Sequence, residues 1–305
     1  HRGEWDSVHR RLEIKIGNAE VLNEPDAADV MVEPQNSERF VTWADLAQLP
    51  ENSDWADWML FLHPEQKEFV EKKYNGPTRL RGVSGSGKTC VMIHRARRLA
   101  RRYKQPVILV TLTESMRKLL DLLVDQLCHT EAALIRIFTM TSLTREIIST
   151  LTPRAAKQFH FVGDLQQKDL LNDAYRNVCH HASFTETVFS NYEEVELKSF
   201  LEDEVGYVRT RFLPEEYNDY LTMRRHGRKI PLADKARQIV LSAVNSWNHS
   251  LAQSHTHDFE SASQSALTLL RQEHSPENAK YVCRCVLVDE VQDLSQIEMQ
   301  ILSNL

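Results

Sequence analysis

The sequence predicts an α/β protein whose parallel sheet, with helices on both faces, is interrupted by a mostly helical inserted domain. Three observations lead to this prediction. Apolar runs of strand length alternate with helical stretches between residues 107 and 139, and another such run returns just before residue 289. The residues between these regions are dominated by helical periodicity. Strands that alternate with helices indicate a parallel sheet, and the long helical stretch indicates an insertion between two of its strands.

The most specific motif is Gly-Val-Ser-Gly-Ser-Gly-Lys-Thr at residues 82–89, here called the phosphate loop. It fits G-x-x-x-x-G-K-[ST], the pattern of loops whose backbone N–H groups hold phosphates. The chain has only 9 glycines, and three of them lie in this loop, which argues against a chance Ser/Gly-rich surface turn. We predict a short strand over 78–81, its start limited by Pro77, and a helix over 88–104. The N-terminus of that helix then faces the phosphates.

Each residue type in the loop suits one task. Glycine at positions 82, 85 and 87 permits backbone conformations and close approaches that a Cβ would obstruct. Lys88 supplies a mobile positive charge for the β- and γ-phosphates, and Thr89 offers its hydroxyl to Mg²⁺. The predicted nucleotide-binding residues of this region are Gly82, Ser84, Gly85, Ser86, Gly87, Lys88, Thr89 and Cys90.

The second motif is the acidic segment Asp289-Glu290-Val291-Gln292-Asp293, which follows the apolar run Val286–Val288. Asp289 is predicted to hold the metal and Glu290 to orient or deprotonate the attacking water. A solvated acidic pair at a strand end is the alternative, which the phosphate loop upstream disfavours. We therefore predict Lys88, Asp289 and Glu290 as catalytic residues, with Thr89 and Asp289 as metal ligands and Gln292 in the nucleotide site.

The remaining elements follow from periodicity. We expect strands at 107–111, 135–139 and 281–288, and helices within 61–76 and at 114–128 and 233–247. The predicted domains are a flanking region of unknown role at 1–60, a nucleotide-binding domain at 61–143 plus 276–305, and a helical insertion at 144–275.

Composition narrows the class of protein. The chain of 305 residues is 42% hydrophobic and can bury a sizeable core. It has no membrane-length apolar run and no visible signal peptide, and its five cysteines form no CxxC pair, so we expect a cytoplasmic protein. Adjacent residues do not converge on one ion, which argues against a metal site at Cys179-His180-His181. Because the first residue is His, we expect a segment of a longer product.

Charge is segregated along the chain although the net charge is −6. Residues 64–110 carry 12 Lys/Arg against 3 Asp/Glu, and residues 220–240 carry 6 against 1. Residues 1–63 and 186–219 are acidic. Local basic surfaces can therefore serve a phosphate backbone. For the basic helix after the phosphate loop, a solvated face and a nucleic-acid track both stay open.

The order of these motifs resembles superfamily one helicases of the UvrD/Rep type over residues 61–305. Leu62-His63-Pro64-Glu65-Gln66 is similar to the family's Q motif, in which the amide, here that of Gln66, reads the adenine edge. Asp289–Asp293 is similar to the family's D-E-x-Q-D motif. The resemblance implies a RecA-like ATP-binding domain (1A), an inserted 1B-like domain, ATP and Mg²⁺ as cofactors, and movement 3′ to 5′ on single-stranded DNA, with DNA favoured over RNA.

Two motifs depart from the family pattern. Val110-Thr111-Leu112-Thr113 lies where the family has T-F-T followed by Lys, but position 115 is Ser, for which Arg117 or Lys118 is a possible substitute. Thr139-Met140-Thr141-Ser142-Leu143 replaces T-F-H-S-L. In the family these segments line the single-strand channel, so the departures concern nucleic-acid binding and not the ATP site.

Two further expectations come from the resemblance. The family's second lobe, with its arginine fingers, is absent, so residues 1–305 alone are expected to hydrolyse ATP very slowly. The segment 220–228 resembles a branch of UvrD-like proteins, and we interpret its basic residues as salt-bridge partners of the acidic 186–219 stretch. A regulatory or defence-associated ATP switch that does not unwind nucleic acid is the alternative function.

Overall fold

The computed structural model of the chain describes residues 60–83, 85–153, 160–272 and 283–305. The chain divides into two compact units, residues 1–79 and residues 80–305. In the first unit the described residues form helix α5 (Pro64–Glu71), where proline occupies the first turn and His63 caps the N-terminus. The helix predicted within 61–76 is confirmed. The flanking region predicted at 1–60 lies outside the described residues except for Leu60.

The second unit contains a parallel sheet with the strand order β2-β1-β5. The central strand has all its residues buried, which explains its continuous apolar sequence. The α/β class with a parallel sheet is therefore confirmed, and two of the strands have the predicted bounds. The strands are β1 (Val107–Thr111), β2 (Ile135–Thr139) and β5 (Cys285–Val288).

The strand predicted at 78–81 is wrong, because these residues are irregular. Pro77 lacks an N–H to donate to a ladder, and Arg79, Leu80 and Arg81 are exposed. A stretch with two arginines and one exposed leucine has no apolar face to bury in a central strand. Among the described residues, the sheet therefore begins after the phosphate loop and not before it.

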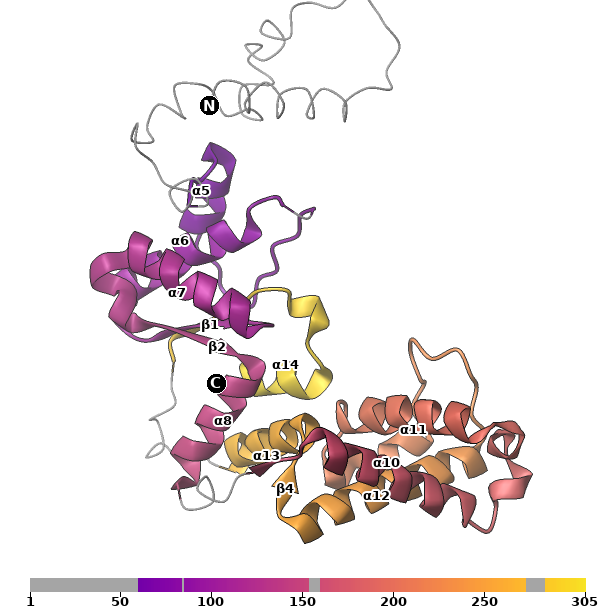
Figure 1. Cartoon of the computed structure of the whole chain (residues 1–305). Helices are drawn as coiled ribbons and strands as arrows, with labels where there is room; N and C mark the ends of the chain where they lie inside the picture. Colours follow the sequence, from indigo (N-terminus) through magenta and orange to yellow (C-terminus); the bar gives the residue numbers. More distant parts are fainter. Residues whose placement is uncertain (1–59, 84, 154–159, 273–282) are drawn as a thin grey trace, which may run out of the picture. The chain divides into compact units, whose positions relative to one another are not determined.

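Helices pack on the sheet from both sides. Ile108 and Val110 of β1 point into one hydrophobic cluster, here called the sheet cluster, with apolar residues of α8, α13 and α14. The alternate residues Val107 and Leu109 point to the opposite face, and Figure 1 shows α6 and α7 on that other side of β1 and β2. The bounds are α6 (Lys88–Tyr103), α7 (Glu114–Cys128), α8 (Met140–Leu151), α13 (Phe259–Gln272) and α14 (Gln296–Ser303).

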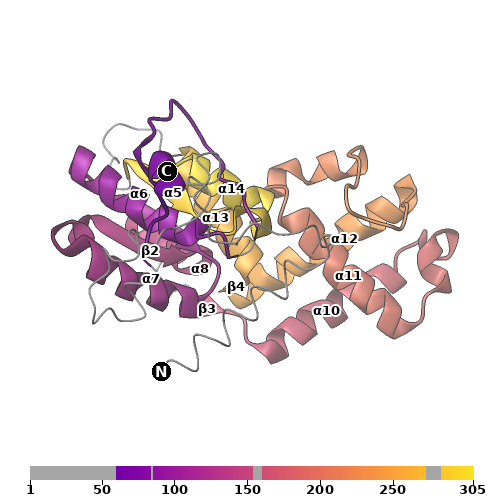
Figure 2. The same ribbon diagram turned by 90° about the horizontal axis from the view of Figure 1, so that it is seen from above.

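A second cluster, the helical cluster, is formed mainly by three long helices that lie together in Figures 1 and 2. Leu170, Leu201, Ile239 and Trp247 are among its buried residues. The helices are α10 (Asp164–Cys179), α11 (Glu194–Arg209) and α12 (Asp234–Ser254), joined by the 3₁₀ helices Phe184–Glu186, Val188–Asn191 and Pro214–Leu221. The helix predicted at 233–247 is thus confirmed and continues to Ser254.

A two-stranded parallel ladder is formed by β3 (His160–Phe161) and β4 (Thr256–His257). Along the chain, β3 lies between α8 and α10, and β4 lies between α12 and α13. Helices α8 and α13 belong to the sheet cluster although both fall largely within the stretch predicted as an insertion. The boundaries of that inserted domain stay a prediction. None of the helices in the described part of the chain is long and apolar enough to cross a bilayer.

Candidate functional site

The phosphate loop makes a tight turn that depends on glycine. Gly85 and Gly87 have φ values of 78° and 74°, in the left-handed region that other residues adopt at a cost. A Cβ on Gly82 would lie 2.6 Å from the Ser86 hydroxyl oxygen. Ser86 N–H donates to the Val83 carbonyl across 3.2 Å and closes the turn. Ser84 lies outside the described residues.

Lys88 bends back over the loop that precedes it. Its ammonium donates to the carbonyl oxygens of Gly82 and Val83, at 3.2 Å and 2.9 Å. The positive charge therefore lies in the curve of the loop, at the N-terminus of α6. Both the ammonium and the helix N-terminus favour an anion at this point.

The two sequence motifs meet at Thr89 and Asp289. The Thr89 hydroxyl donates to a carboxylate oxygen of Asp289 across 3.0 Å, and these residues are 200 positions apart. Asp289 N–H also donates to the Val110 carbonyl across 2.8 Å, which fixes the carboxylate at the end of β5. The side chain is buried. Burial raises the pKa of Asp289 above its usual value, and the hydrogen bond from Thr89 opposes that rise.

Glu290 follows in a strained conformation. Its φ of 51° and ψ of 43° are left-handed, which costs a non-glycine residue about 1–2 kcal/mol. The side chain is exposed, and its carboxylate accepts a hydrogen bond from the Gln292 amide. The same amide approaches Asp293 at 3.5 Å. Gln292 therefore contacts the predicted general base, a role for it that sequence reasoning did not specify.

The oxygen atoms at this site fit Mg²⁺ bound together with a triphosphate. Mg²⁺ is usually held by one or two protein oxygens, with phosphate oxygens and waters completing its octahedron. Thr89 and Asp289 supply two such oxygens. Among the described residues there is no group of three or more His, Cys, Asp or Glu side chains arranged for a metal, at Cys179-His180-His181 or elsewhere.

Two other predicted site residues have contacts of their own. Cys90 is buried in the first turn of α6, and its burial raises the pKa of the thiol to about 11, so it packs as a neutral side chain. Gln66 belongs to the first unit, where its amide oxygen accepts from His63 N–H at 2.9 Å and caps α5. Its place beside an adenine stays a prediction.

The segments expected to line a nucleic-acid channel begin helices at the carboxyl edge of the sheet. Thr113 caps α7 by accepting from Met116 N–H, and Thr139 forms a reciprocal capping box with Ser142 at the start of α8. Parallel strands end at the same edge, so these caps share an edge with Asp289. Arg117 pairs with Glu114 and Asp121 on its own helix, and a substitution of Arg117 or Lys118 for the family's lysine stays a prediction.

The basic end of α6 lies at the opposite edge. Arg97 and Arg101 pair with Glu131, at 3.5 Å and 2.8 Å, in the 3₁₀ helix that precedes β2. The helix rises 1.5 Å per residue, so Arg101 is roughly 20 Å from Thr89. Part of this charge is thus neutralised within the chain and stands away from the nucleotide site.

Two arginines of the segment 220–228 pair with the acidic 186–219 stretch, as we interpreted from the sequence. Arg225 pairs with the buried Glu204 at 2.7 Å, and Arg228 approaches the same carboxylate at 3.4 Å. Arg237 donates to three backbone carbonyls, those of Tyr220, Leu221 and Met223. The salt-bridge interpretation is confirmed for Arg225 and Arg228.

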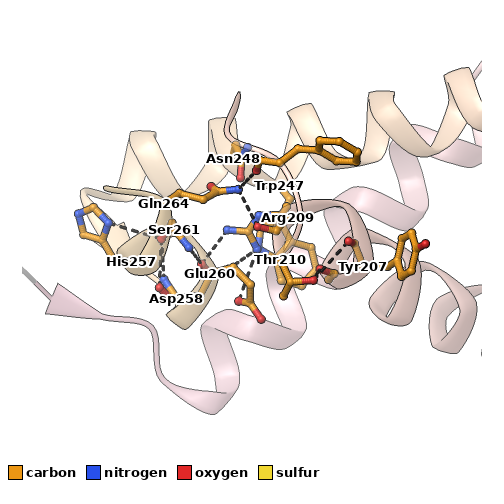
Figure 3. A network of polar contacts seen from close by, with 12 residues as sticks. Tyr207, Arg209, Thr210, Trp247, Asn248, His257, Asp258, Glu260, Ser261 and Gln264 are labelled. Atoms are coloured by element: carbon orange, nitrogen blue, oxygen red, sulfur yellow. Dashed lines mark hydrogen bonds and ion pairs between the residues drawn. The ribbon is translucent and has the colours of Figure 1, made fainter. Parts of the chain in front are cut away.

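Sequence reasoning missed a buried polar network where α11, α12 and α13 meet (Figure 3). Arg209 makes a two-bond ion pair with Asp258, at 2.6 Å and 2.7 Å, and Trp247 donates to the same carboxylate at 2.8 Å. Gln264 donates to the carbonyls of Arg209 and Phe212. One signal was available, because Asp258 and Ser261 have the spacing of a helix N-cap pair.

A parallel sheet that places a glycine-rich loop, a lysine and a hydroxyl against a buried carboxylate defines the class of nucleoside-triphosphate-binding α/β proteins. Within this class, the family model of the UvrD/REP helicase N-terminal domain matches residues 62–305, and the chain belongs to that family. Membership implies an ATP-dependent helicase domain that binds nucleic acid and hydrolyses ATP. No curated protein matches the chain.

Proposed function

We propose that the chain is the ATP-binding part of an ATP-dependent helicase or translocase that moves 3′ to 5′ on single-stranded DNA and hydrolyses ATP with Mg²⁺. The observation that carries the proposal is the hydrogen bond between Thr89 and Asp289, which joins the phosphate loop to the acidic segment. A RecA-like 1A domain with a 1B-like insertion at 144–275, in the cytosol, is part of the same proposal.

The residues have separate tasks in this proposal. Lys88 exchanges its two loop carbonyls for the β- and γ-phosphates, and Gln66 reads adenine. Thr89 and Asp289 hold Mg²⁺, which when bound neutralises charge on the phosphate oxygens. Glu290 takes a proton from the attacking water, and the Gln292 amide keeps its carboxylate oriented. The slow turnover expected of residues 1–305 alone belongs to this proposal as well.

The nucleic-acid path is proposed along residues 111–115 and 139–143. Its support is that Thr113 and Thr139 begin helices at the sheet edge that carries Asp289. A strand bound there would contact the same edge that holds the nucleotide. DNA is proposed over RNA on family membership.

A regulatory ATP switch that does not unwind nucleic acid is the second candidate. It is favoured by Met140 and Thr141, which stand where the family has an aromatic residue and a histidine. Base stacking on an aromatic side chain is worth about 1–3 kcal/mol per base. Without that contribution, nucleotide binding could change a partner contact while the strand is held too weakly for unwinding.

Strand displacement by the full-length protein tests the proposal. ATP should drive displacement on duplexes with a 3′ tail and not on those with a 5′ tail, and Glu290→Gln should abolish it. Lys168→Ala, an exposed lysine on α10, serves as the control and should behave as wild type. ATP-dependent binding of a partner protein without displacement would favour the switch. If Lys88→Ala left Mg²⁺–ATP binding unchanged, both candidates would be wrong.

A further inference from the structure

The network in Figure 3 fixes the C-terminal end of α11 from several directions. Arg209, the last residue of α11, is 1% exposed, and its carbonyl accepts from Gln264 on α13. Its guanidinium is held by Asp258, whose carboxylate also accepts hydrogen bonds from the indole N–H of Trp247 on α12 and from the Ser261 N–H on α13. The position of Thr210, the next residue, is therefore set by three helices.

Thr210 in turn contacts the helix that follows the acidic segment. Ile297 N–H, in the first turn of α14, donates to the Thr210 carbonyl across 3.0 Å. The Ile297 side chain is buried in the sheet cluster together with Leu213. A cavity of about 410 Å³ lies beside this contact, between residues 209–211, 259–263 and 293–298. The Thr210 contact therefore places the first turn of α14 next to residues 209–211.

The acidic segment is thereby held at both of its ends. Its first residue, Asp289, is fixed by the hydrogen bond to Val110 in β1. Its last residue, Asp293, is followed within two positions by Ser295, the N-cap of α14. Glu290, between these ends, has a left-handed backbone. Such a conformation persists only where the surrounding structure determines it, because relaxation of either end releases it.

We propose that Arg209 and Asp258 are positioning residues for ATP turnover: through Thr210 and α14 they hold the downstream end of the acidic segment, and so the Glu290 carboxylate. This inference rests on the proposed function of Glu290. It assigns to the helical part a direct influence on the rate of hydrolysis, separate from any contact with nucleic acid. Nucleotide affinity depends on Lys88 and the phosphate loop, and no contact of the network with the described residues of that loop is seen.

Asp258→Asn and Glu204→Gln form a matched pair of variants. Each neutralises one buried carboxylate that pairs with an arginine in the helical part. Glu204 and its partner Arg225 belong to the 203–230 region, outside the contacts that lead to α14. In the full chain, both variants should lower thermal stability to a similar extent. A difference between them in hydrogen exchange or in kcat would therefore reflect where the lost ion pair lies and not the loss of stability.

Hydrogen exchange and steady-state kinetics provide the readouts. Asp258→Asn should accelerate exchange across residues 289–303 and lower kcat for ATP by about tenfold to a hundredfold, as small misplacements of catalytic groups do. Its KM for ATP should stay within about twofold, since the phosphate loop is intact. Glu204→Gln should leave both the exchange of 289–303 and kcat unchanged. Trp247→Phe removes the indole N–H together with part of a buried ring system, and it should reproduce the effects of Asp258→Asn at smaller size.

Equal effects of Asp258→Asn and Glu204→Gln, or unchanged exchange at 289–303 in both Asp258→Asn and Trp247→Phe, would overturn the inference. Hydrogen exchange requires no ATP, so it separates this inference from the proposed function. A wild-type chain that neither binds nor hydrolyses ATP refutes the proposed function and with it the positioning of Glu290, whatever the exchange shows. If Asp258→Asn fails to fold, Trp247→Phe decides alone.

Discussion

The carboxyl edge of the sheet and the junction of α11, α12 and α13 (here the helical junction) each bury one aspartate, but the two carboxylates have opposite surroundings. Asp289 is 8% exposed and accepts a hydrogen bond from the neutral Thr89 hydroxyl. Asp258 is 5% exposed and receives both Nη groups of Arg209, with Trp247 and Ser261 completing its shell. Burial acts on both in the same direction. It prevails at Asp289, whose pKa is raised, whereas the bonds and charge of Arg209 outweigh it at Asp258 and hold that pKa at about 2.

The surroundings of a buried carboxylate indicate whether its role is structural or functional. Removing a carboxylate from water costs free energy unless a cation and hydrogen bonds compensate. Asp258 has its cation within the chain and stabilises the junction. Asp289 has no cation of comparable geometry among the residues that the structure describes, which is the condition expected of a residue whose cation arrives with a ligand.

The largest expected effect concerns Glu290, beside Asp289. Glu290→Gln should lower ATP turnover by about 10²–10⁴-fold, the usual contribution of general acid–base catalysis. ATP affinity should change little, because Lys88 and Thr89 remain. Turnover and equilibrium binding of a fluorescent ATP analogue measure the two quantities. A parallel loss of binding would show that Glu290 acts mainly in nucleotide affinity.

The comparison itself is tested by neutralising each aspartate in turn. Asp258→Asn should lower the free energy of unfolding by about 3 kcal/mol, because Arg209 is left as a buried charge without its partner. Asp289→Asn should cause no such loss in the absence of ligand, since it removes a desolvated carboxylate. Denaturant unfolding of both variants measures this. Equal destabilisation would contradict the distinction between the two sites.

Acid should weaken the junction in a defined range of pH. The pKa of Asp258 is about 2 in the folded chain, below the ordinary value of about 3.9. The stabilisation from this lowered pKa, on the order of 2 kcal/mol, is present above the ordinary pKa and lost as pH falls toward 2. The stability difference between wild type and Asp258→Asn should therefore narrow from pH 5 to pH 2.5. If the difference in free energy of unfolding between wild type and Asp258→Asn stayed constant over this range, the lowered pKa of Asp258 would not be its cause.

Protonation of Asp289 should change the stability of the unliganded fold in the opposite direction. Because its pKa is raised in the folded chain, protonation of Asp289 stabilises the unliganded fold, and that gain is lost as pH rises through the folded pKa. The same protonation removes the negative charge that would bind Mg²⁺. Mg²⁺-dependent ATP binding should thus weaken on acidification at a higher pH than an ordinary aspartate would give. This is the smallest effect, and titration of wild type against Asp289→Asn measures it.

Much of the sheet and of the site could be predicted from local sequence. Strands 107–111 and 135–139 and helix 114–128 have the predicted bounds, because their apolar spacing fixes which residues are buried. The strand predicted at 78–81 is wrong, since its one leucine is exposed between two arginines and Pro77 precedes the stretch. The phosphate loop and acidic segment were recognisable because phosphate chemistry demands particular residue types at fixed spacing.

The sequence by itself determined the chemical groups: the glycine loop with Lys88 and Thr89, and the carboxylates of Asp289 and Glu290. Only the tertiary structure decided what these and other charges contact. The approach of Thr89 to Asp289 across 200 positions, and the pairing of Arg209 with Asp258 across 49, depend on how helices pack. The spacing of residues along the chain does not identify such partners, because side chains distant in sequence meet only once the apolar faces between them are buried.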